Sequence, residues 1–411
     1  MSGNRAFVIV GASLAGAKAA EKLRTEGFDG PVILLGAEQE RPYERPPLSK
    51  DYLLGKADRE SIYVHPAGWY GEHDVTLRLG VTVRGIDRAS REVTLADGSR
   101  VGYAKLLLAT GSEPRRLAVP GAGLDGVCYL RQAEDSDRIK TAFQTATRVV
   151  VIGAGWIGLE AAAAARAAGA EVTVLEAADL PLLRVLGPEV AQVFAALHTE
   201  QGVDLRCGVQ VAEITGAGGH ADGVRLADGS HIPADVIIAG VGITPRTGLA
   251  EAAGLPVANG IQVDAQLRTA DPDIFAAGDV ASAYHPRLGT SIRVEHWANA
   301  LHQPLAAARA MLGQDASYER LPYFFTDQYD LGMEYSGYVP PGGHDDVVLR
   351  GDVAGRQFLA FWLRGGRVLA GMNVNIWDQT DAIQALVRSG QPVAAAGLAD
   401  PELPLAGLLP G

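Results

Sequence analysis

Short apolar runs, each followed by a glycine-rich turn and a helical pattern, recur along the chain. The first run, Ala6–Val10, predicts a buried strand, and a helix with apolar positions on one face begins near Leu14. A second apolar run at 31–35 stands at the spacing of a strand–helix–strand unit. The same succession returns with predicted strands at 148–152 and 171–175 around an alanine-rich helix. We therefore expect α/β domains built on parallel sheets.

The two glycine turns have the spacing of dinucleotide-binding fingerprints. The first covers Gly11–Gly16 (GASLAG) and the second covers Gly153–Gly158 (GAGWIG). In such a turn the first glycine permits a tight bend, the second lets the backbone approach a pyrophosphate, and the third lets the helix pack closely on the strand. The helix N-terminus then offers N–H groups and a partial positive charge to the phosphates. Two such turns predict two bound dinucleotides.

Acidic residues near the ends of the following strands are candidates for binding the ribose hydroxyls. Glu176 lies 23 residues beyond Gly153, and Glu38 lies 27 residues beyond Gly11. A carboxylate at this position accepts hydrogen bonds from the ribose and repels a 2′-phosphate. The second site is therefore expected to prefer NADH to NADPH, and Arg184 is the nearby residue that would weaken this preference.

The first turn departs from the fingerprint at its second glycine position, which Ser13 occupies. Its Cβ and hydroxyl stand where the backbone should approach the phosphate most closely. Crowding at this point predicts a less firmly held dinucleotide, whereas a hydrogen bond from the hydroxyl to the phosphate would strengthen binding. We expect crowding, with the hydrogen bond as the alternative.

Further glycine segments stand where strands of nucleotide-binding domains end. Residues 106–111 and 236–242 each predict a last buried strand that returns the chain to the other domain. Residues 267–279 predict a strand that ends in Gly278 and Asp279. A carboxylate beside a helix start at this point is suited to the ribityl hydroxyls of a flavin, although an ordinary turn has the same sequence.

Composition and charge narrow the class of protein. The chain has 411 residues, 47% hydrophobic and 20% charged, which indicates a globular protein of two to four domains. Its net charge of −12 disfavours a generic nucleic-acid binder. No apolar run has the length of a membrane span, so we expect a soluble cytoplasmic protein. The two cysteines, Cys128 and Cys207, have no disulfide-scaffold or metal-knuckle spacing, and no histidine pair has ligand spacing.

The order of these motifs resembles the flavoproteins with two dinucleotide-binding domains, the glutathione-reductase-like superfamily. The resemblance covers residues 5 to about 320. Residues 41–50 (RPYERPPLSK) resemble the ferredoxin-reductase branch, which includes putidaredoxin reductase and the reductases of Rieske dioxygenases. Residues 295–297 (EHW) and 323–329 (YFFTDQY) are similar to motifs of that branch. The resemblance implies FAD at the first turn and NADH at the second.

The resemblance also implies roles for individual residues. Lys50 would lie beside flavin N5 with Glu160 as its partner, as the two catalytic residues. Arg45 and Arg131 would bind the FAD phosphate or orient the ring, and Trp297 would lie at the isoalloxazine edge. The alternative is that Lys50 is a solvent-exposed loop lysine and Glu160 a helix residue, neither with a catalytic role. The remaining candidates for cofactor binding are Gly11, Ser13, Leu14, Ala15, Gly16, Glu38, Val83, Ala109, Thr110, Gly111, Gly153, Gly155, Ile157, Gly158, Glu176, Arg184, Gly242, Gly278, Asp279, Glu295 and His296.

The position of the cysteines separates this chain from the disulfide reductases. No cysteine precedes Cys128, so the chain lacks the dithiol that those enzymes carry after the first strand–helix–strand unit. Electrons would therefore leave directly from the reduced flavin. We expect an FAD-dependent NADH:ferredoxin oxidoreductase that delivers single electrons to an acidic [2Fe–2S] ferredoxin serving a cytochrome P450 or a ring-hydroxylating oxygenase. The alternatives are a rubredoxin or monodehydroascorbate-type reductase, or an apoptosis-inducing-factor-like NADH-binding flavoprotein.

Docking of an acidic ferredoxin on a chain with a net charge of −12 requires a local basic patch. The candidates for this patch are Arg293, Arg320, Arg364 and Arg367.

The expected fold class is α/β, with two Rossmann-like dinucleotide-binding domains and a C-terminal α+β domain. The FAD-binding domain is expected to be discontinuous, at 1–112 and 240–320, with the NAD-binding domain at 113–239. In the C-terminal domain, 321–411, antiparallel strands are expected at 347–350, 357–362 and 367–371, with a helix at 376–389. Little secondary structure is expected after that helix.

Overall fold

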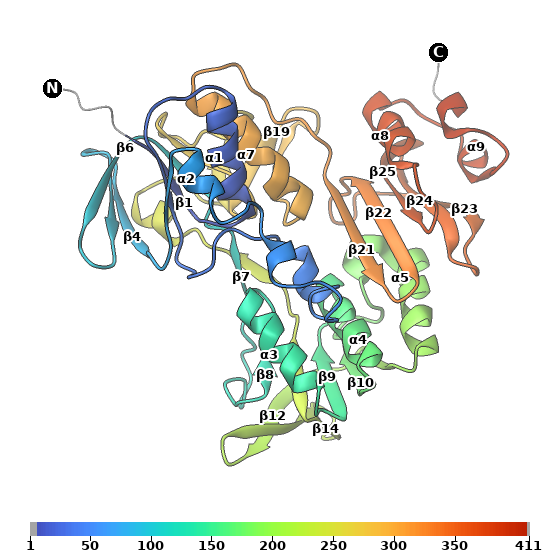
Figure 1. Cartoon of the computed structure of the whole chain (residues 1–411). Helices are drawn as coiled ribbons and strands as arrows, with labels where there is room; N and C mark the ends of the chain where they lie inside the picture. Colours follow the sequence, from blue (N-terminus) through green and yellow to red (C-terminus); the bar gives the residue numbers. More distant parts are fainter. Residues whose placement is uncertain (1–5, 409–411) are drawn as a thin grey trace. The chain divides into compact units, whose positions relative to one another are not determined.

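A computed structural model of the chain describes residues 6–408. These residues form two compact units (Figure 1). Unit 1 contains the described residues up to Arg45 together with Asp58–Glu113 and Ile243–Arg320. Unit 2 contains Pro46–Ala57, Pro114–Gly242 and the described residues from Leu321 onward. Within residues 6–408, no helix combines the length and the apolar character needed to cross a bilayer.

Unit 1 is built on a mixed seven-stranded sheet. Its strand order is β3-β2-β1-β6-β5-β4, with β18 paired to β6. The strands β3, β2, β1, β6 and β18 pair in parallel, and the hairpin of β4 and β5 continues the sheet in antiparallel fashion. The bounds are β1 Ala6–Val10, β2 Val32–Leu35, β3 Val75–Arg78, β4 Val83–Asp87, β5 Glu92–Leu95, β6 Arg100–Leu108 and β18 Ile274–Ala276.

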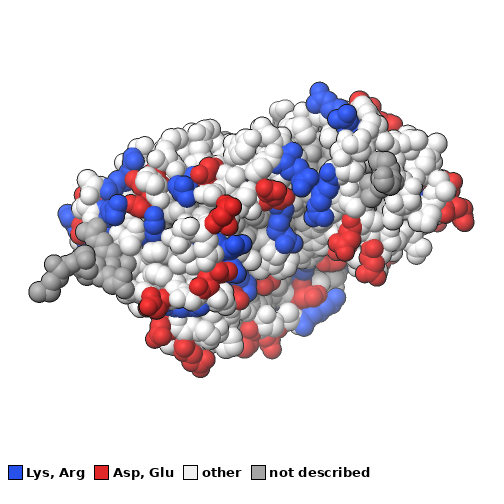
Figure 2. Space-filling model, turned by 90° about the horizontal axis from the view of Figure 1, so that it is seen from above, with Lys and Arg blue, Asp and Glu red and all other residues white. Residues whose placement is uncertain are grey.

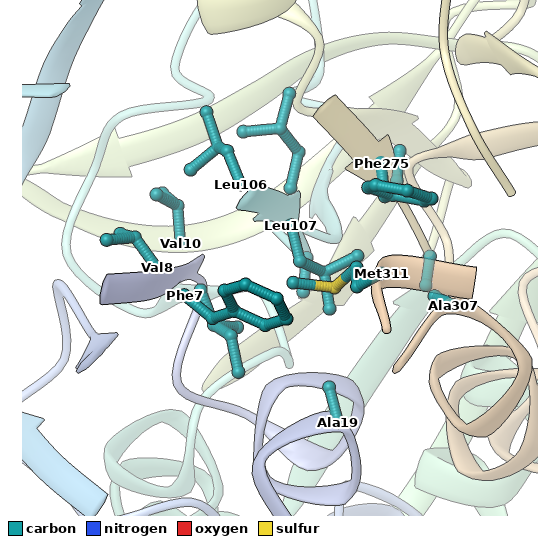
Figure 3. Packing of buried hydrophobic residues seen from close by; sticks show 14 of the residues in the cluster. Phe7, Val8, Val10, Ala19, Leu106, Leu107, Phe275, Ala307 and Met311 are labelled. Atoms are coloured by element: carbon teal, nitrogen blue, oxygen red, sulfur yellow. The ribbon is translucent and has the colours of Figure 1, made fainter. Parts of the chain in front are cut away.

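The core of unit 1 lies where two helices cover the apolar strands. The helices α1 (Leu14–Thr25) and α7 (Trp297–Met311) pack against each other, as Figure 1 shows. Phe7, Leu107 and Met311 are among the buried residues that meet beneath them (Figure 3). The smaller elements of unit 1 are η2 Glu60–Ile62, α2 Trp69–Glu72, β16 Ile243–Pro245, α6 Gly248–Ala252, β17 Ile261–Val263, β19 Ala281–His285 and β20 Thr290–Ile292. Strand β7 (Ser112–Pro114) begins in unit 1 and ends at the first residue of the next stretch of unit 2.

Unit 2 contains a second Rossmann-like sheet, in which all strands are parallel. Its strand order is β11-β10-β9-β15-β8. The strands are β8 Val127–Cys128, β9 Arg148–Ile152, β10 Glu171–Leu175, β11 Asp204–Arg206 and β15 Val236–Ala239. Helices α3 (Ala133–Phe143), α4 (Trp156–Ala167) and α5 (Leu183–Glu200) accompany this sheet, and β12 Val211–Ala217, β13 His220–Leu226 and β14 His231–Pro233 form an antiparallel sheet.

The short segment 46–57 packs within unit 2. It begins with the 3-10 helix η1 (Pro46–Ser49). Ser136 on α3 donates a hydrogen bond to the Leu48 carbonyl at 2.8 Å, and the Tyr52 hydroxyl donates to Asp137 at 2.6 Å. Leu53 joins the hydrophobic core of unit 2. These contacts fix the loop that carries Ser49 and Lys50.

The C-terminal part of unit 2 is an antiparallel sheet with helices. The strand order is β21-β22-β25-β24-β23, with bounds β21 Tyr323–Gln328, β22 Leu331–Gly337, β23 Asp346–Asp352, β24 Gln357–Arg364 and β25 Arg367–Val374. The three strands expected here are confirmed, and so is the fold class. The expected helix begins later, as α8 (Thr380–Ser389), because Asn375 and Asp378 have left-handed backbone conformations. The little secondary structure expected in the tail consists of α9 (Ala395–Ala399) and η3 (Leu405–Leu408), which pack through Leu398 and Leu405.

Helix α5 contains a kink that the C-terminal sheet supports. Gly187 is non-helical, with φ 76° and ψ 170°, and Pro188 follows it. Pro188 has no N–H to continue the helix, so carbonyl groups before the kink lose their helical donors. The indole Nε1–H of Trp362, on β24, donates to the Leu186 carbonyl at 3.0 Å. Trp362 is 1% exposed, so this hydrogen bond is made in the core.

Candidate functional site

The first glycine turn of unit 1 lies directly against the turn that follows β6. A Cβ on Gly11, where φ is +119°, would stand 2.1 Å from the Ala109 carbonyl oxygen. A Cβ on Gly16 would stand 2.0 Å from the Gly11 carbonyl oxygen. The first and third glycines are therefore required by the packing of the chain itself. The turn also brings the predicted segment Ala109–Gly111 next to the fingerprint.

The N-terminus of α1 is open to an anion. Ser13 is the N-cap residue in an extended conformation, and its hydroxyl makes no hydrogen bond to the first-turn N–H groups. The first turn contains no acidic residue, and Leu14 and Ala15 within it are buried. Unoccupied first-turn N–H groups and the helix dipole favour a phosphate at this position. These residues fit the pyrophosphate of a dinucleotide such as FAD.

Gly278 and Asp279 lie beside the same turn. A Cβ on Gly278, where φ is +81°, would stand 3.3 Å from the Cβ of Ala15. The Ser112 hydroxyl donates to Asp279 Oδ2 at 2.7 Å, which ties the segment after β6 to this carboxylate. Three segments far apart in the sequence thus converge in unit 1, as the motif pattern predicts. A carboxylate such as that of Asp279 is a suitable acceptor for hydroxyl groups.

Glu38 and Arg45 form an ion pair rather than two separate contacts. Arg45 Nη2 lies 2.8 Å from Glu38 Oε1, and the Tyr43 hydroxyl donates to Glu38 Oε2. Burial lowers the pKa of the Arg45 guanidinium, but Tyr43 and Glu38 outweigh burial and the net shift is upward. The sequence predicts both residues as cofactor contacts but gives no signal for their pairing. The pairing fixes the orientation of the Glu38 carboxylate after β2.

Residues 295–297 surround the start of α7. Glu295 forms an ion pair with Arg293, and Trp297 Nε1 donates to Glu44 Oε2 at 3.1 Å. His296 is the N-cap residue, and burial lowers its pKa to about 4, with Asp279 acting in the opposite direction. His296 is therefore neutral at pH 7, and the indole of Trp297 is held in a fixed orientation.

The second glycine turn, in unit 2, has open space at its middle glycine. A Cβ on Gly153, where φ is +97°, would stand 2.5 Å from the Gly240 carbonyl oxygen, and one on Gly158 would stand 2.0 Å from the Gly153 carbonyl oxygen. A Cβ on Gly155 would meet nothing within 4 Å. Packing explains the outer two glycines, whereas the middle glycine keeps open space at the N-terminus of α4. This space fits the close approach of an NADH pyrophosphate.

Glu176 is held by backbone N–H groups at both carboxylate oxygens, one of them from the glycine turn. Oε2 accepts the Ala154 N–H at 2.7 Å, and Oε1 accepts the Ala178 N–H at 2.8 Å. Each oxygen has a second acceptor site, so the carboxylate remains able to accept ribose hydroxyls. The exposed Arg184 lies on the first turn of α5, before the kink. No ion pair between Arg184 and Glu176 occurs among the described contacts.

The buried ion pair of unit 2 joins Lys50 to Glu160. Lys50 Nζ lies 2.7 Å from Glu160 Oε1, and the side chains are 14% and 3% exposed. Glu160 stands on α4, five residues beyond Gly155, and also accepts hydrogen bonds from the hydroxyls of Ser49 and Thr326. The Phe325 ring lies 5.3 Å from Lys50 Nζ. A carboxylate this deeply buried requires such donors.

Sequence reasoning found Lys50 and Glu160 but missed Ser49 and Thr326. The missed signal lies in residues 323–328, where Phe324, Thr326 and Gln328 occupy one face of a strand. Polar residues on the buried face of a strand indicate a polar partner inside the protein.

The remaining candidates for cofactor binding lie in the core, bond to the backbone or stand at the surface. Val83 belongs to the hydrophobic core of unit 1, and Thr110 donates to the Arg246 carbonyl at 2.9 Å. Ile157 on the first turn of α4 is 45% exposed, which suits a residue that a bound dinucleotide covers. Arg131 precedes α3, where its N–H donates to Asp135, and Gly242 has φ +97°.

The prediction that Arg293 belongs to an exposed basic docking patch was wrong. The Arg293 side chain is 7% exposed because it pairs with Glu295 and donates to the Asp279 carbonyl at 3.3 Å. Arg320, Arg364 and Arg367 are exposed. Their place in a docking surface stays a prediction.

Comparison with known proteins agrees with this geometry. Residues 5–303 match the family described as pyridine nucleotide-disulphide oxidoreductase, and residues 323–409 match the reductase C-terminal family. Rhodocoxin reductase from Rhodococcus erythropolis is 40% identical over 399 residues, which cover 97% of this chain and 93% of that protein. The ferredoxin–NAD(+) reductase component of the anthranilate 1,2-dioxygenase system from Burkholderia cepacia is 41% identical over 401 residues, with 97% and 98% covered.

A solved structure extends the likeness to three dimensions. The reductase in the covalent putidaredoxin reductase–putidaredoxin complex superimposes with a TM-score of 0.95 at 38% identity, and the match covers 98% of each chain. This chain belongs to the pyridine nucleotide-disulphide oxidoreductase family. It is an oxidoreductase that uses FAD and NAD(H), and the resemblance noted in its motifs is confirmed.

Proposed function

We propose that this chain is an NADH-dependent ferredoxin reductase containing FAD. It transfers single electrons to an acidic [2Fe–2S] ferredoxin, which serves a cytochrome P450 or a ring-hydroxylating oxygenase. The supporting observation is the pair of glycine turns at the N-termini of α1 and α4, one in each unit. Two relatives named as ferredoxin reductases, one of them a component of a dioxygenase system, support the acceptor, and the matches cover 98% and 100% of their lengths.

The proposal divides the chain by cofactor. Residues 1–112 and 240–320 bind FAD, residues 113–239 bind NADH, and residues 321–411 form the C-terminal domain. The supporting observations are the mixed sheet around β1, the separate parallel sheet around β9 and the antiparallel sheet of β21–β25. Pro46–Ala57 belongs to the first stretch by sequence and to unit 2 by packing.

FAD supplies the redox chemistry, because a flavin takes two electrons from NADH as hydride and releases them one at a time. The residues of unit 1 hold it. First-turn N–H groups of α1 bind the pyrophosphate, and Asp279 accepts the ribityl hydroxyls. Glu38, oriented by Arg45, accepts the ribose hydroxyls, and Trp297 borders the ring.

The residues of unit 2 bind and orient NADH. First-turn N–H groups of α4 bind its pyrophosphate beside Gly155, and Glu176 accepts the hydroxyls of the adenosine ribose. Lys50 supplies a positive charge where negative charge develops on reduction. Glu160 holds the Lys50 ammonium in place and balances its charge within the buried site.

The cysteines support direct delivery of electrons to an external acceptor. Cys128 and Cys207 are both free, and burial raises the pKa of each thiol, with Glu176 and Asp179 adding to the rise at Cys207. The thiols are therefore protonated at neutral pH and poorly reactive. Free cysteines and a dependence on NADH also support a cytoplasmic location.

A visible spectrum of the purified protein followed by titration with NADH tests the function. We expect flavin absorbance that NADH bleaches without air, and recovery of that absorbance when an oxidised [2Fe–2S] ferredoxin is added. If NADH bleaches the flavin but the reduced flavin then reduces no iron–sulfur protein, the proposal is contradicted. This result would favour the alternative of an NADH-binding flavoprotein that is not a reductase of iron–sulfur proteins. A faster reaction with rubredoxin than with ferredoxin would change the acceptor.

A further inference from the structure

A row of buried polar side chains leads away from Glu160 through unit 2. Thr326 Oγ1 lies 2.6 Å from Glu160 Oε1, and Gln328 Nε2 lies 3.2 Å from Thr326 Oγ1. Gln328 Oε1 lies 2.8 Å from His198 Nε2, and the Tyr329 hydroxyl lies 3.4 Å from His198 Nδ1. The row therefore joins β21 to both α4 and α5.

The elements place these residues by their ordinary periodicities. Phe324, Thr326 and Gln328 are alternate residues of β21 and share its buried face. Phe324 contacts Trp156 of α4, four residues before Glu160 on the same face of that helix. The row is therefore fixed by an aromatic contact at one end of the strand.

The chemistry of each group gives the row one direction. The Glu160 carboxylate only accepts hydrogen bonds, so the Thr326 hydroxyl must donate to it. The Thr326 oxygen then accepts from the Gln328 amide, which leaves the Gln328 carbonyl to accept from His198. His198 must therefore carry its proton on Nε2, and its Nδ1 is left to accept from Tyr329. Each donor in the row thus points toward Glu160.

Burial supports this assignment. Thr326 and Gln328 are 1% exposed and His198 is fully buried. Burial lowers the pKa of His198, although its hydrogen bond to Gln328 opposes the shift. A neutral imidazole is what the row requires, because an imidazolium would donate from both nitrogens.

We infer that Thr326 is a positioning residue for the Lys50–Glu160 pair, and that Gln328 and His198 orient its hydroxyl. Lys50 and Thr326 both donate to Glu160 Oε1, while Ser49 donates to Oε2. Without the Thr326 donor, the carboxylate loses the contact that holds Oε1 toward Lys50. The inference deepens the proposed function and rests on it.

The tautomer of His198 gives a test that needs no turnover. In the FAD-loaded protein, ¹⁵N and ¹³C NMR of labelled histidine should show a neutral His198 with its proton on Nε2 at pH 7. His198→Asn assigns the signal. A proton on Nδ1, or an imidazolium at pH 7, would overturn the directed row, whatever the protein reduces.

Matched substitutions test the positioning role. Thr326→Val removes the hydroxyl at nearly constant volume, and Thr326→Ser keeps it. We expect Thr326→Val to slow reduction of the bound flavin at saturating NADH by about tenfold, the effect of one hydrogen bond to a charged group. Thr326→Ser should restore most of the rate. The control is Thr141→Val, which removes an exposed hydroxyl that donates to the Asp137 carbonyl on α3.

Three outcomes are distinguishable in stopped-flow and binding measurements. A Thr326→Val protein with wild-type reduction rates would overturn the inference while leaving the proposed function intact. If NADH does not reduce the flavin of the wild-type protein, the proposed function is overturned. The NMR result would still show whether the hydrogen bonds of the row have the inferred direction. If Thr326→Val loses FAD or unfolds, the Gln328→Leu variant is used for the test instead. We expect it to reduce its flavin several-fold more slowly than the wild type, and its equilibrium affinity for NAD⁺ to change less than its reduction rate. An unchanged rate in Gln328→Leu counts against the inference.

Discussion

Two of the candidate site carboxylates in this protein, Glu176 and Glu160, are each held by two or more donors. Glu176 accepts two backbone N–H groups, and Glu160 accepts an ammonium and two hydroxyls. A buried or half-buried carboxylate keeps its charge only when such donors replace water. Fixed carboxylates then discriminate between ligands by charge, and this gives the first prediction.

Replacing Glu176 should change the coenzyme preference. Wild-type protein should have a higher kcat/KM with NADH than with NADPH, because the carboxylate would face a 2′-phosphate. We expect Glu176→Ala to narrow this ratio by about tenfold, equivalent to about 1.4 kcal/mol. Glu176→Gln serves as the control that retains an acceptor for one backbone N–H. A wild-type preference for NADPH would contradict the role.

Lys50 can be tested by removing its charge at similar length. Lys50→Met should slow reduction of the flavin by NADH by about 10- to 100-fold, the loss of a charge that stabilises the reacting centre. FAD content should be unchanged, because the residues proposed to bind the FAD pyrophosphate and hydroxyls are not altered. Lys56→Met, in the same loop but exposed, is the matched control. Equal reduction rates in the two variants would remove Lys50 from the catalytic residues.

The role of Ser13 separates two physical effects. Its hydroxyl makes no bond to the helix that it caps, so it is available to a phosphate. The available hydroxyl favours the hydrogen bond over the crowding expected from the sequence. We therefore expect Ser13→Ala and Ser13→Gly both to weaken FAD binding, by about tenfold for one hydrogen bond to a charged acceptor. Crowding would give the opposite sign for Ser13→Gly. Flavin release in a denaturant titration, followed by fluorescence, compares the proteins.

At the level of elements, regular patterns were predictable and departures from them were not. β1, β9 and β10 have the bounds that their apolar runs predict, and each glycine turn lies where strand gives way to helix. The Glu38–Arg45 pair, the Thr326 contact and the late start of α8 escaped prediction. The two side-chain contacts depend on partners that no periodicity specifies, and the start of α8 depends on residues in left-handed backbone conformations.

The kink in α5 gives a prediction about stability. Trp362→Phe keeps most of the ring but leaves the Leu186 carbonyl without its donor. An unsatisfied buried carbonyl costs about 1–3 kcal/mol, and each kcal/mol lowers the midpoint by about 2–4 °C in a unit of this size. Thermal unfolding of the FAD-loaded protein should show the shift. Trp377→Phe, at an indole that is 54% exposed, should shift the midpoint little.

Across the whole molecule, acidic residues outnumber basic ones by 48 to 36. Figure 2 nevertheless shows Lys and Arg side chains gathered over part of one face. Arg364 and Arg367 are exposed and directly opposite each other in the hairpin of β24 and β25. Like charges in this arrangement repel, so a folded protein retains them at some cost. An acidic partner would relieve that repulsion.

Salt should therefore distinguish the two half-reactions. Ferredoxin reduction should slow several-fold as the Debye length falls from about 10 Å at 0.1 M to about 3 Å at 1 M, while reduction of the flavin by NADH should change much less. Replacing Arg364 and Arg367 by Ser should reduce the salt dependence. The same change at Arg84 and Arg100, exposed on β4 and β6, is the control. If neither salt nor these substitutions changes the rate of ferredoxin reduction, the ferredoxin docks through apolar contacts and the predicted basic patch is wrong.

The segment Pro46–Ala57 has a consequence for exchanging modules among reductases. It is flanked by residues of unit 1 in the sequence, yet it packs in unit 2 and carries Ser49 and Lys50. A graft of the contiguous stretch 114–242 would transfer Glu160 and leave its lysine and both hydroxyl donors in the host. In this chain the Lys50–Glu160 pair and its two hydroxyl donors are therefore encoded in three separate stretches of gene, and a chimera must include all three to inherit the group.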